Sequence, residues 1–430
     1  MRRAALSRTG TLLSALAIVA MLGLALLVRT PTSGVDVRVL RDGEPFPALI
    51  RVAKPGRREI LASARPGRRP RAAQRGRGGA AQHLRCRDRA LPRPMKPLLF
   101  VIRRPSRFTS IDRDLIAAHL PVREWRTRLD PRGVLATVRA VSRSGGVVCW
   151  FAGWHTLVPL TAAWVLRRPS LLITGGVDLA AEPDIGYGMQ RGGPRQWAAR
   201  WCLRRAHALL TNSHYSQGEL ERNAGVPAAR ALVVHHGLPD PYGELPGTEP
   251  RERLVITIGI VDRRNLQRKG LRPFVQAAAH LPDARFVVVG PWDDDAVDEL
   301  RAIAGPNVEL TGWIEDAELD GLLRRASVCV QASRHEGFGM SVAEGMLAGC
   351  LPVVTRAGAL PEVVGPEGFV AEDPRPETLA AAIGAALDAA DGRARARARE
   401  RILREFPVAM RERGLLEALR RAGVKDAARG

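Results

Sequence analysis

The sequence has few cysteines, and their spacing is not that of a domain held together by zinc or by disulfides. The five are scattered along 430 residues, are odd in number and show no Cys-x-x-Cys spacing: Cys86, Cys149, Cys202, Cys329 and Cys350. This pattern argues against a zinc site and against a disulfide framework. It is typical of a protein from a reducing compartment whose cysteines are small, buried, apolar residues.

Acidic residues are scarce relative to basic ones, which gives the chain a net charge of +22. Such a charge suggests nucleic-acid binding, but it is concentrated at one end. Residues 1–94 contain 20 lysines and arginines against 5 aspartates and glutamates, whereas the rest of the chain has a net charge of only +7. Zinc-finger spacing and an aromatic RNA-binding motif are both absent. We therefore expect no nucleic-acid partner, because the remaining excess suits phosphorylated substrates or anionic lipid.

The first 94 residues differ in composition from the rest. Residues 11–28 form an uncharged run flanked by arginines, which predicts a transmembrane anchor or an uncleaved signal. The following stretch, from about Arg51 to Pro94, is dominated by Arg, Pro, Gly and Ala, has no periodicity and is predicted to be disordered.

Two interpretations of this extension stay open. In one, residues 1–94 are a single anchor with a flexible stalk, and the arginines after the apolar run keep the following segment in the cytoplasm. In the other, the natural protein begins at Met95, since MKPLLFVIRR is a plausible opening strand, and residues 1–94 are an extension that is not normally made.

From residue 95 onward, short apolar runs alternate with helical segments, which predicts an α/β protein with parallel sheets covered on both faces. We expect two doubly wound, Rossmann-like domains facing a cleft, over residues 95–245 and 246–405, and a C-terminal helix over 406–430. Gly237–Arg251, rich in Gly and Pro, is the predicted linker. The predicted strands are 98–102, 147–151, 170–174, 208–212 and 231–235, then 254–258, 285–289, 308–311, 328–331 and 351–355.

The segment 332–365, ASRHEGFGMSVAEGMLAGCLPVVTRAGALPEVVG, carries the predicted site. It follows a strand, turns through glycines and enters a helix at about Met340. The glycines allow close approach of a ligand, and the unpaired N–H groups of the helix N-terminus favour an anion such as a diphosphate. Glu344, one turn further, is placed to accept the hydroxyls of a ribose, and Glu336 to accept those of a sugar beyond the diphosphate.

These residues resemble the motif of glycosyltransferase family 4, group 1 enzymes with the GT-B fold, in which two glutamates are separated by seven residues. Here they are Glu336 and Glu344, and the surrounding E-G-F-G, A-G-C-x-P-V-V and G-x-x-x-E-V-V patterns also match. The resemblance implies a nucleoside-diphosphate sugar as co-substrate and no cofactor. The predicted donor-binding residues of this segment are Gly337, Phe338, Gly339, Met340 and Glu344, and Glu336 is a predicted catalytic residue.

The second predicted element is Ile256–Gly270, in which a strand ends at Gly259, a basic loop follows and a helix begins at Leu271. In the resembled family a lysine before glycine, with a nearby arginine, holds the donor diphosphate. Lys269 matches this lysine, and its cation would also stabilise the departing diphosphate, so it is a predicted catalytic residue. For the arginine, Arg263, Arg264 and Arg268 compete and Arg264 is favoured, with Arg264 and Arg268 the candidates for donor binding.

The N-terminal half resembles the family less closely. Many members carry a histidine in the loop where this chain has Gly175, Gly176 and Asp178. Asp178 and His155 are therefore candidates for contacting the sugar or the acceptor, with loop capping an equal alternative for Asp178. Tyr187-Gly188 and Asn212-Ser213 are expected to line the cleft.

Two other patterns suggest metal binding, but each has a structural explanation. Asp293-Asp294-Asp295 precedes a predicted helix, where aspartate commonly caps. His235 and His236 are adjacent in a predicted strand and would point to opposite faces. We expect no metal site.

Together these features predict a retaining glycosyltransferase of the hexosyltransferase type. It would move a sugar from a nucleoside-diphosphate sugar to a glycan or lipid-linked acceptor in cell-surface polysaccharide or glycolipid synthesis. We expect a cytoplasmic protein, at the inner face of the plasma membrane if it contacts lipid peripherally or through its anchor. The alternatives are another GT-B enzyme (an epimerase or phosphorylase), a non-catalytic nucleotide-sugar binder, and a nucleic-acid-binding protein.

Overall fold

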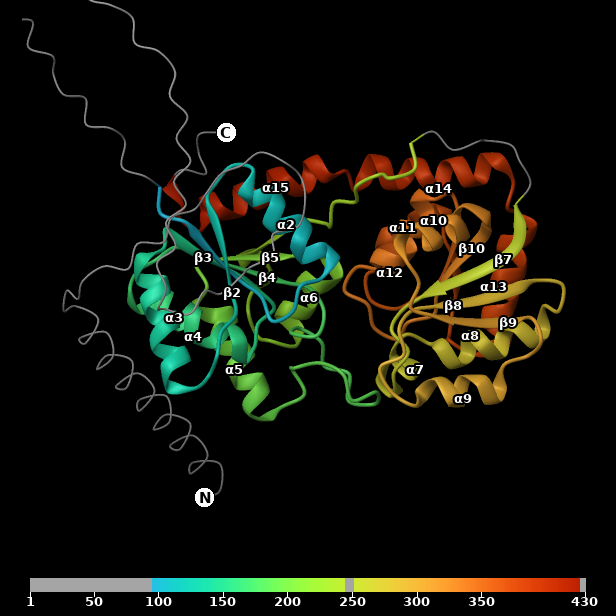
Figure 1. Ribbon diagram of the computed structural model, residues 1–430, viewed down its shortest axis with the longest axis horizontal. Coiled ribbons are helices and arrows are strands. Elements are labelled where there is room, and N and C mark those ends of the chain that lie inside the picture. The colour runs from blue at the N-terminus through green and yellow to red at the C-terminus, as the bar shows by residue number, and fades with distance from the viewer. Residues whose placement is uncertain (1–94, 244–250, 426–430) are drawn as a thin grey trace, which may run out of the picture. The chain divides into compact units, whose positions relative to one another are not determined.

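The computed structural model describes residues 95–243 and 251–425 of the chain (Figure 1). The predicted apolar segment 11–28, the Arg-rich stretch that follows it and part of the predicted linker lie outside these residues. Among the helices of residues 95–243 and 251–425, none combines the length and the apolar character needed to cross a membrane.

The first half forms one parallel sheet of six strands, in the order β2-β1-β3-β4-β5-β6. Four of its strands are buried along their whole length, as expected for apolar runs covered on both faces. The strands are β1 (Leu98–Val101), β2 (Val122–Trp125), β3 (Gly146–Trp150), β4 (Ser170–Thr174), β5 (Ala208–Thr211) and β6 (Ala231–Val233).

Helices cover both faces of this sheet, and the alternation of side chains along each strand divides the core into two clusters. Residues such as Leu99 and Cys149 pack with α3, α4 and α5, whereas Leu98 and Trp150 pack with α2 and α15. The helices of the first half are α2 (Arg107–Ala117), α3 (Pro131–Arg143), α4 (Trp154–Val165), α5 (Gly193–Arg205), α6 (His214–Arg222) and the 3-10 turn η1 (Ala228–Arg230).

The second half repeats the plan with a six-stranded parallel sheet in the order β12-β11-β10-β7-β8-β9. Its strands are β7 (Glu252–Ile258), β8 (Arg285–Val289), β9 (Val308–Gly312), β10 (Ala326–Gln331), β11 (Leu351–Thr355) and β12 (Phe369–Ala371). Its helical elements are α7 (Arg263–Arg268), α8 (Leu271–Ala277), η2 (Ala278–His280), α9 (Ala296–Ile303), α10 (Asp316–Arg325), α11 (Met340–Leu347), α12 (Leu360–Val364), η3 (Gly365–Glu367), α13 (Pro376–Asp388) and α14 (Gly392–Glu405). The predicted α/β fold with two doubly wound sheets is confirmed.

The last helix, α15 (Val408–Arg421), returns to the first sheet. Leu415, Ala418 and Leu419 belong to the core cluster of the N-terminal sheet, while α14 packs on α11 of the second half. Arg411 fixes this return: it is fully buried, and its guanidinium Nη2 lies 2.6 Å from Asp112 Oδ2 on α2. The chain therefore crosses between the halves twice, once in each direction.

Among the elements that were not predicted, two have a clear physical reason. Strand β2, with the sequence VREW, is only half buried because it lies at the edge of the sheet, so it lacks the continuous apolar run of the inner strands. Helix α7 occupies the stretch predicted to be a basic loop after Gly259. It forms because Asp262 caps it, accepting a hydrogen bond of 2.6 Å from the backbone N–H of Asn265.

Candidate active site

The predicted glycine-rich turn links strand β10 to helix α11 and depends on its glycines. Gly339 has a φ of 107°, and a Cβ there would lie 2.7 Å from Leu360 Cδ2. A Cβ on Gly337 would lie 2.3 Å from the carbonyl oxygen of Gly175, in the N-terminal half. The turn therefore brings backbone against backbone, which only glycine allows. Helix α11 begins directly after it, at Met340.

The turn also contacts the N-terminal half through hydrogen bonds. Ser213 Oγ donates to the carbonyl oxygen of Gly337 over 2.8 Å. His335 is buried, and its Nε2 lies 3.0 Å from Glu219 Oε1 on α6. The rings of Tyr187 and Tyr215 flank this histidine, at 5.2 and 5.8 Å between centroids. The predicted turn and the predicted cleft-lining residues Tyr187 and Ser213 thus lie together.

Glu336 lies at the centre of a polar group that surrounds the turn. Its Oε2 accepts a hydrogen bond of 2.6 Å from Gln331 Nε2 and lies 3.8 Å from Arg268 Nη1. Gln331 in turn accepts a hydrogen bond from Ser341 at the start of α11. Gln331 was not predicted. A signal was available, because it is the last residue of β10, at the carboxyl edge of the sheet, where such folds bind ligands.

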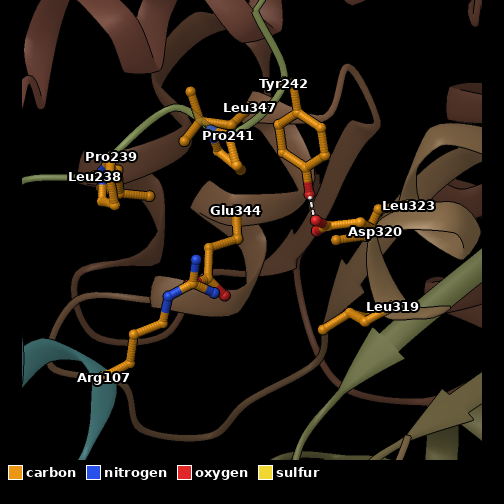
Figure 2. A pocket seen from close by; sticks show the side chains of 10 residues that line it. All are labelled: Arg107, Leu238, Pro239, Pro241, Tyr242, Leu319, Asp320, Leu323, Glu344 and Leu347. Carbon is orange, nitrogen blue, oxygen red and sulfur yellow. Dashed lines mark hydrogen bonds and ion pairs between the residues drawn. The ribbon is translucent and has the colours of Figure 1, made fainter. Parts of the chain in front are cut away.

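Glu344 lies one turn into α11, and its carboxylate Oε1 is 3.1 Å from Arg107 Nη1 (Figure 2). Arg107 is the first residue of α2, so the pair joins the two halves. Burial raises the pKa of Glu344, and the charge of Arg107 opposes this shift. The same carboxylate lines a small pocket whose opposite wall includes Tyr242, which donates a hydrogen bond of 3.0 Å to Asp320. Arg107 was not predicted, since nothing in its local sequence indicates a partner in the other half.

Lys269 caps the C-terminus of α7 and points toward the same region. Its alkyl chain packs on Gly259, where a Cβ would lie 2.8 Å from Lys269 Cδ. Burial lowers the pKa of its ammonium group, while the negative charges of Glu336 and Glu344 oppose the shift. A half-buried ammonium group in this position can pair with a phosphate oxygen.

Of the two predicted arginines, the structure brings only Arg268 to Glu336. Its guanidinium lies over the ring of Tyr187, 5.0 Å from the centroid, and its carbonyl oxygen accepts a hydrogen bond of 2.8 Å from Arg334 N–H. Arg264, the favoured candidate, is exposed on α7, so the geometry supports Arg268 better and the choice between them stays a prediction. Since the C-terminal end of α7 meets the glycine-rich turn, Arg264 lies one helical turn further from the site.

Asp178 is placed to position loops rather than to touch a substrate, because it is fully buried. Its Oδ2 accepts a hydrogen bond of 3.0 Å from Ala152 N–H, and its Oδ1 one of 3.3 Å from Gly175 N–H. Burial raises the pKa of Asp178 to about 6, and the backbone hydrogen bonds oppose the shift. These hydrogen bonds fit the loop-capping alternative, and a contact between Asp178 and a sugar or acceptor stays a prediction. Asp178 holds the loops after β3 and β4, and thus Gly175 against Gly337.

The remaining predicted residues are divided between the cleft and the core. His155 is half-buried after β3, with Nε2 2.8 Å from the carbonyl oxygen of Trp150. Asn212 is buried and accepts a hydrogen bond from Arg411, and a Cβ on Gly175 would lie 1.9 Å from its Nδ2, so it supports both α15 and the loop that meets Gly337. His235 Nε2 lies 2.6 Å from Glu362 Oε1, whereas His236 stacks on Trp150.

Two groups of side chains in residues 95–243 and 251–425 have the geometry to hold a cation. They are His214, His235 and Glu362, and Glu182, Glu219 and His335. Neither contains the aspartates 293–295. Asp294 accepts a hydrogen bond of 3.0 Å from Ala296 N–H at the start of α9, and Asp295 forms an ion pair with Arg263.

Comparisons with known proteins agree with this geometry. Residues 252–389 match the family model of Glycosyl transferases group 1. The chain is 41% identical over 190 residues to the MMP alpha-(1->4)-mannosyltransferase of Mycolicibacterium hassiacum, covering 42% of this chain and 45% of that protein. It is 35% identical over 102 residues to the GDP-mannose-dependent alpha-(1-6)-phosphatidylinositol dimannoside mannosyltransferase of Mycobacterium tuberculosis, covering 24% and 26%. The chain thus spans less than half the length of these two curated relatives.

Solved structures with the same fold match over much more of the chain. Anabaena HepE in complex with UDP and glucose has a TM-score of 0.61 and 20% identity, covering 76% of this chain and 99% of that one. Sucrose-phosphate synthase from Thermosynechococcus elongatus has a TM-score of 0.59 and 18% identity, covering 76% and 98%. The predicted GT-B fold and group 1 resemblance are confirmed, while the assignment to family 4 stays a prediction.

Proposed function

We propose that this chain is a group 1 glycosyltransferase that transfers a sugar from a nucleoside-diphosphate sugar to an acceptor hydroxyl, a proposal supported by the family match over residues 252–389 and by the named relatives. One observation carries the proposal. Glu336, Arg268 and Lys269 lie together beside the glycine-rich start of α11, and Glu344 follows one turn later. A nucleotide sugar requires cations and a helix N-terminus for its diphosphate, one carboxylate for the hydroxyls of its sugar and another for those of its ribose.

In this proposal the diphosphate binds between Lys269, Arg268 and the N–H groups at the start of α11. Lys269 stabilises the charge that builds on the departing diphosphate. Glu336 accepts hydroxyl hydrogen bonds from the donor sugar, and Gln331 holds its carboxylate in place. Glu344 accepts the ribose hydroxyls. Asp178 acts only through the backbone it positions.

The reaction is proposed to retain the anomeric configuration, as the resemblance to family 4 implies. The acceptor hydroxyl attacks the anomeric carbon on the face from which the diphosphate departs. The new glycosidic bond forms as the bond to the phosphate oxygen breaks, and that oxygen takes the hydroxyl proton. The protein supplies positioning and charge stabilisation, and no protein nucleophile is needed.

The names of the relatives support a mannosyl donor as the first to test, since both curated relatives described above are named mannosyltransferases. HepE, however, was solved with UDP and glucose, so the base and the sugar need a direct comparison. Both a glycan and a lipid-linked acceptor fit the proposal, with peripheral contact to the inner face of the plasma membrane and a role in cell-surface glycan synthesis.

The test is a thermal-shift screen of the full chain with GDP-mannose, UDP-glucose and ADP-glucose, because a ligand that binds only the folded state raises the melting temperature. The donor that binds is then incubated with mannose-containing oligosaccharides and with a lipid extract. NMR of the product gives the anomeric configuration. Formation of an epimerised donor or of a sugar phosphate, without transfer, would reject the proposal, as would binding without turnover on either acceptor class.

A further inference from the structure

Three neighbouring helices on one face of the N-terminal sheet carry charge of one sign. Helices α3, α4 and α5 contain seven arginines and no aspartate or glutamate. Figure 1 shows them next to one another, and α4 packs against both neighbours. The other α-helices packed on this sheet differ, because α2, α6 and α15 contain carboxylates as well as arginines. The positive surface is therefore a property of these three helices and not of the domain as a whole.

A group of aromatic side chains lies on this positive face, which we call the tryptophan platform: Trp164, Trp197, Trp201 and the associated Arg205. Trp197, Trp201 and Arg205 are four residues apart on α5 and so form one stripe. The rings of Trp197 and Trp201 stack at 5.9 Å. The Arg205 guanidinium lies 4.4 Å from the Trp164 ring and 4.6 Å from the Trp201 ring.

The platform is exposed although its residues are large and apolar. Trp164 is 38% and Trp197 is 39% exposed. Trp201 is more deeply placed, and its indole N–H donates to Thr161 Oγ1 over 2.9 Å, which holds the platform on α4. Further arginines are exposed on the same three helices: Arg195 and Arg204 on α5, and Arg132, Arg139 and Arg143 on α3. Large exposed apolar groups beside such charges mark an interaction surface.

We propose that this face docks on an anionic lipid bilayer. Tryptophan favours the boundary between headgroups and acyl chains, because its ring is apolar and its N–H is polar. Arginine extends an apolar stem along that boundary and pairs with lipid phosphates. Three helices with several arginines and no carboxylate form a surface that is complementary to a negatively charged leaflet.

A glycan is the other chemical class that stacks on exposed tryptophans, and the platform suits it less well. Sugar hydroxyls need hydrogen-bond acceptors as well as a stacking surface, and α3, α4 and α5 offer no carboxylate. The Trp201 N–H is already used by Thr161. The positive charge, which a neutral glycan does not require, remains unexplained in that case.

This inference deepens the proposed membrane contact by naming its surface, and it does not depend on which sugar is transferred. Helix α4 begins at the carboxyl edge of β3, where it contains His155, and ends at Val165, next to Trp164 of the platform. The face that meets the bilayer would thus belong to the half of the protein opposite the donor-binding half. A lipid-linked acceptor could reach the cleft while its chain stays in the membrane.

The experiment uses the full chain and vesicles of phosphatidylcholine with phosphatidylglycerol that carries brominated acyl chains, which quench tryptophan on contact. We expect tryptophan emission to fall on addition of these vesicles. Most of that quenching should be lost in the Trp164→Phe/Trp197→Phe double variant. The matched control is Trp292→Phe/Trp313→Phe, which removes two exposed tryptophans of the donor-binding half and should keep the quenching. Residues 1–94 are the same in every variant, so their contribution cancels.

The charge is tested by replacing Arg195 and Arg204 with glutamine. This change should raise the lipid concentration for half-maximal quenching at least about fivefold, since one arginine near an anionic surface contributes about that factor. Arg393→Gln, on α14, is the control. Equal quenching in the Trp164→Phe/Trp197→Phe variant and the unchanged protein would overturn the proposal. So would a change in tryptophan emission on addition of a soluble oligosaccharide, if the vesicles cause none. Donor binding, measured without vesicles, separates this result from failure of the proposed function.

Discussion

The ion pair between Arg107 and Glu344 leads to a quantitative prediction about donor affinity. In the proposed site Glu344 accepts the ribose hydroxyls, yet its carboxylate is already 3.1 Å from the Arg107 guanidinium. Donor binding must therefore displace Arg107 or share the carboxylate with it. Replacing Arg107 with alanine frees the acceptor oxygens, whereas replacing Glu344 removes them.

The size of each effect follows from the exposure of the two side chains. Arg107 is 55% exposed, so the ion pair is screened by water, and pairs of this kind contribute up to about 1 kcal/mol. Arg107→Ala should then tighten donor binding by up to about fivefold. Hydrogen bonds to a charged group contribute roughly 1.5–3 kcal/mol each, so Glu344→Ala should weaken binding by about 10- to 100-fold or more.

The assay is isothermal titration of the full chain with the donor found by the thermal-shift screen, for both single variants and the double variant. In the Glu344→Ala background, Arg107→Ala should have no effect, because the competition no longer exists. Arg113→Ala, on the same helix but paired with Asp114 and Glu124, is the matched control. Weaker donor binding in Arg107→Ala would refute the competition and make Arg107 a donor ligand.

Three further predictions concern single positions. Lys269→Ala should lower the transfer rate by about 100-fold or more with little change in melting temperature, whereas the rate of Arg264→Ala should stay within about twofold of wild type, because only Lys269 points toward the turn. Comparable rates for the two variants in a transfer assay would contradict this. Burial raises the pKa of Asp178 to about 6, so the stabilisation present below pH 4 is lost as the pH rises through 6. The stability of wild type relative to Asp178→Asn, measured by denaturant unfolding, should therefore fall by roughly 2–3 kcal/mol from pH 4 to pH 7. A rise over this pH range would show the opposite linkage. Arg411→Ala should lower the free energy of unfolding by about 3–5 kcal/mol, because it leaves Asp112 charged and buried without its partner. Urea unfolding of this variant is compared with that of the exposed control Arg413→Ala, and a similar loss in both would indicate a surface effect instead.

The sequence predicted those parts of the fold and site that are encoded locally. Ten of the twelve strands within residues 95–243 and 251–425 were found because each is a short apolar run. The other two, β2 and β12, are short and lie at an edge of a sheet. The glycine-rich turn and the start of α11 at Met340 were found because glycine and helix periodicity are visible within a few residues.

The parts that were not predicted depend on contacts between distant segments. Arg107 reaches Glu344, and Glu219 reaches His335, only when the two halves come together. Asp178 looked equally suited to a substrate and to a loop, since burial decides between these roles and burial is a property of the whole fold. Helix α7 was missed although Asp262 is a capping residue, because the arginines after it resemble a solvated loop.

The return of α15 to the first sheet has a consequence for how the chain is made. Asp112 and Arg411 are 299 residues apart, and the buried face that contains Leu415 and Leu419 is completed only by the last helix. During synthesis the N-terminal half must leave the ribosome with part of one apolar face uncovered until α15 has been translated. Such a topology favours binding of a chaperone to this face or slow passage through a partly folded state. Loss of the final helix by truncation would damage the half of the protein that was made first, and not the half next to the cut.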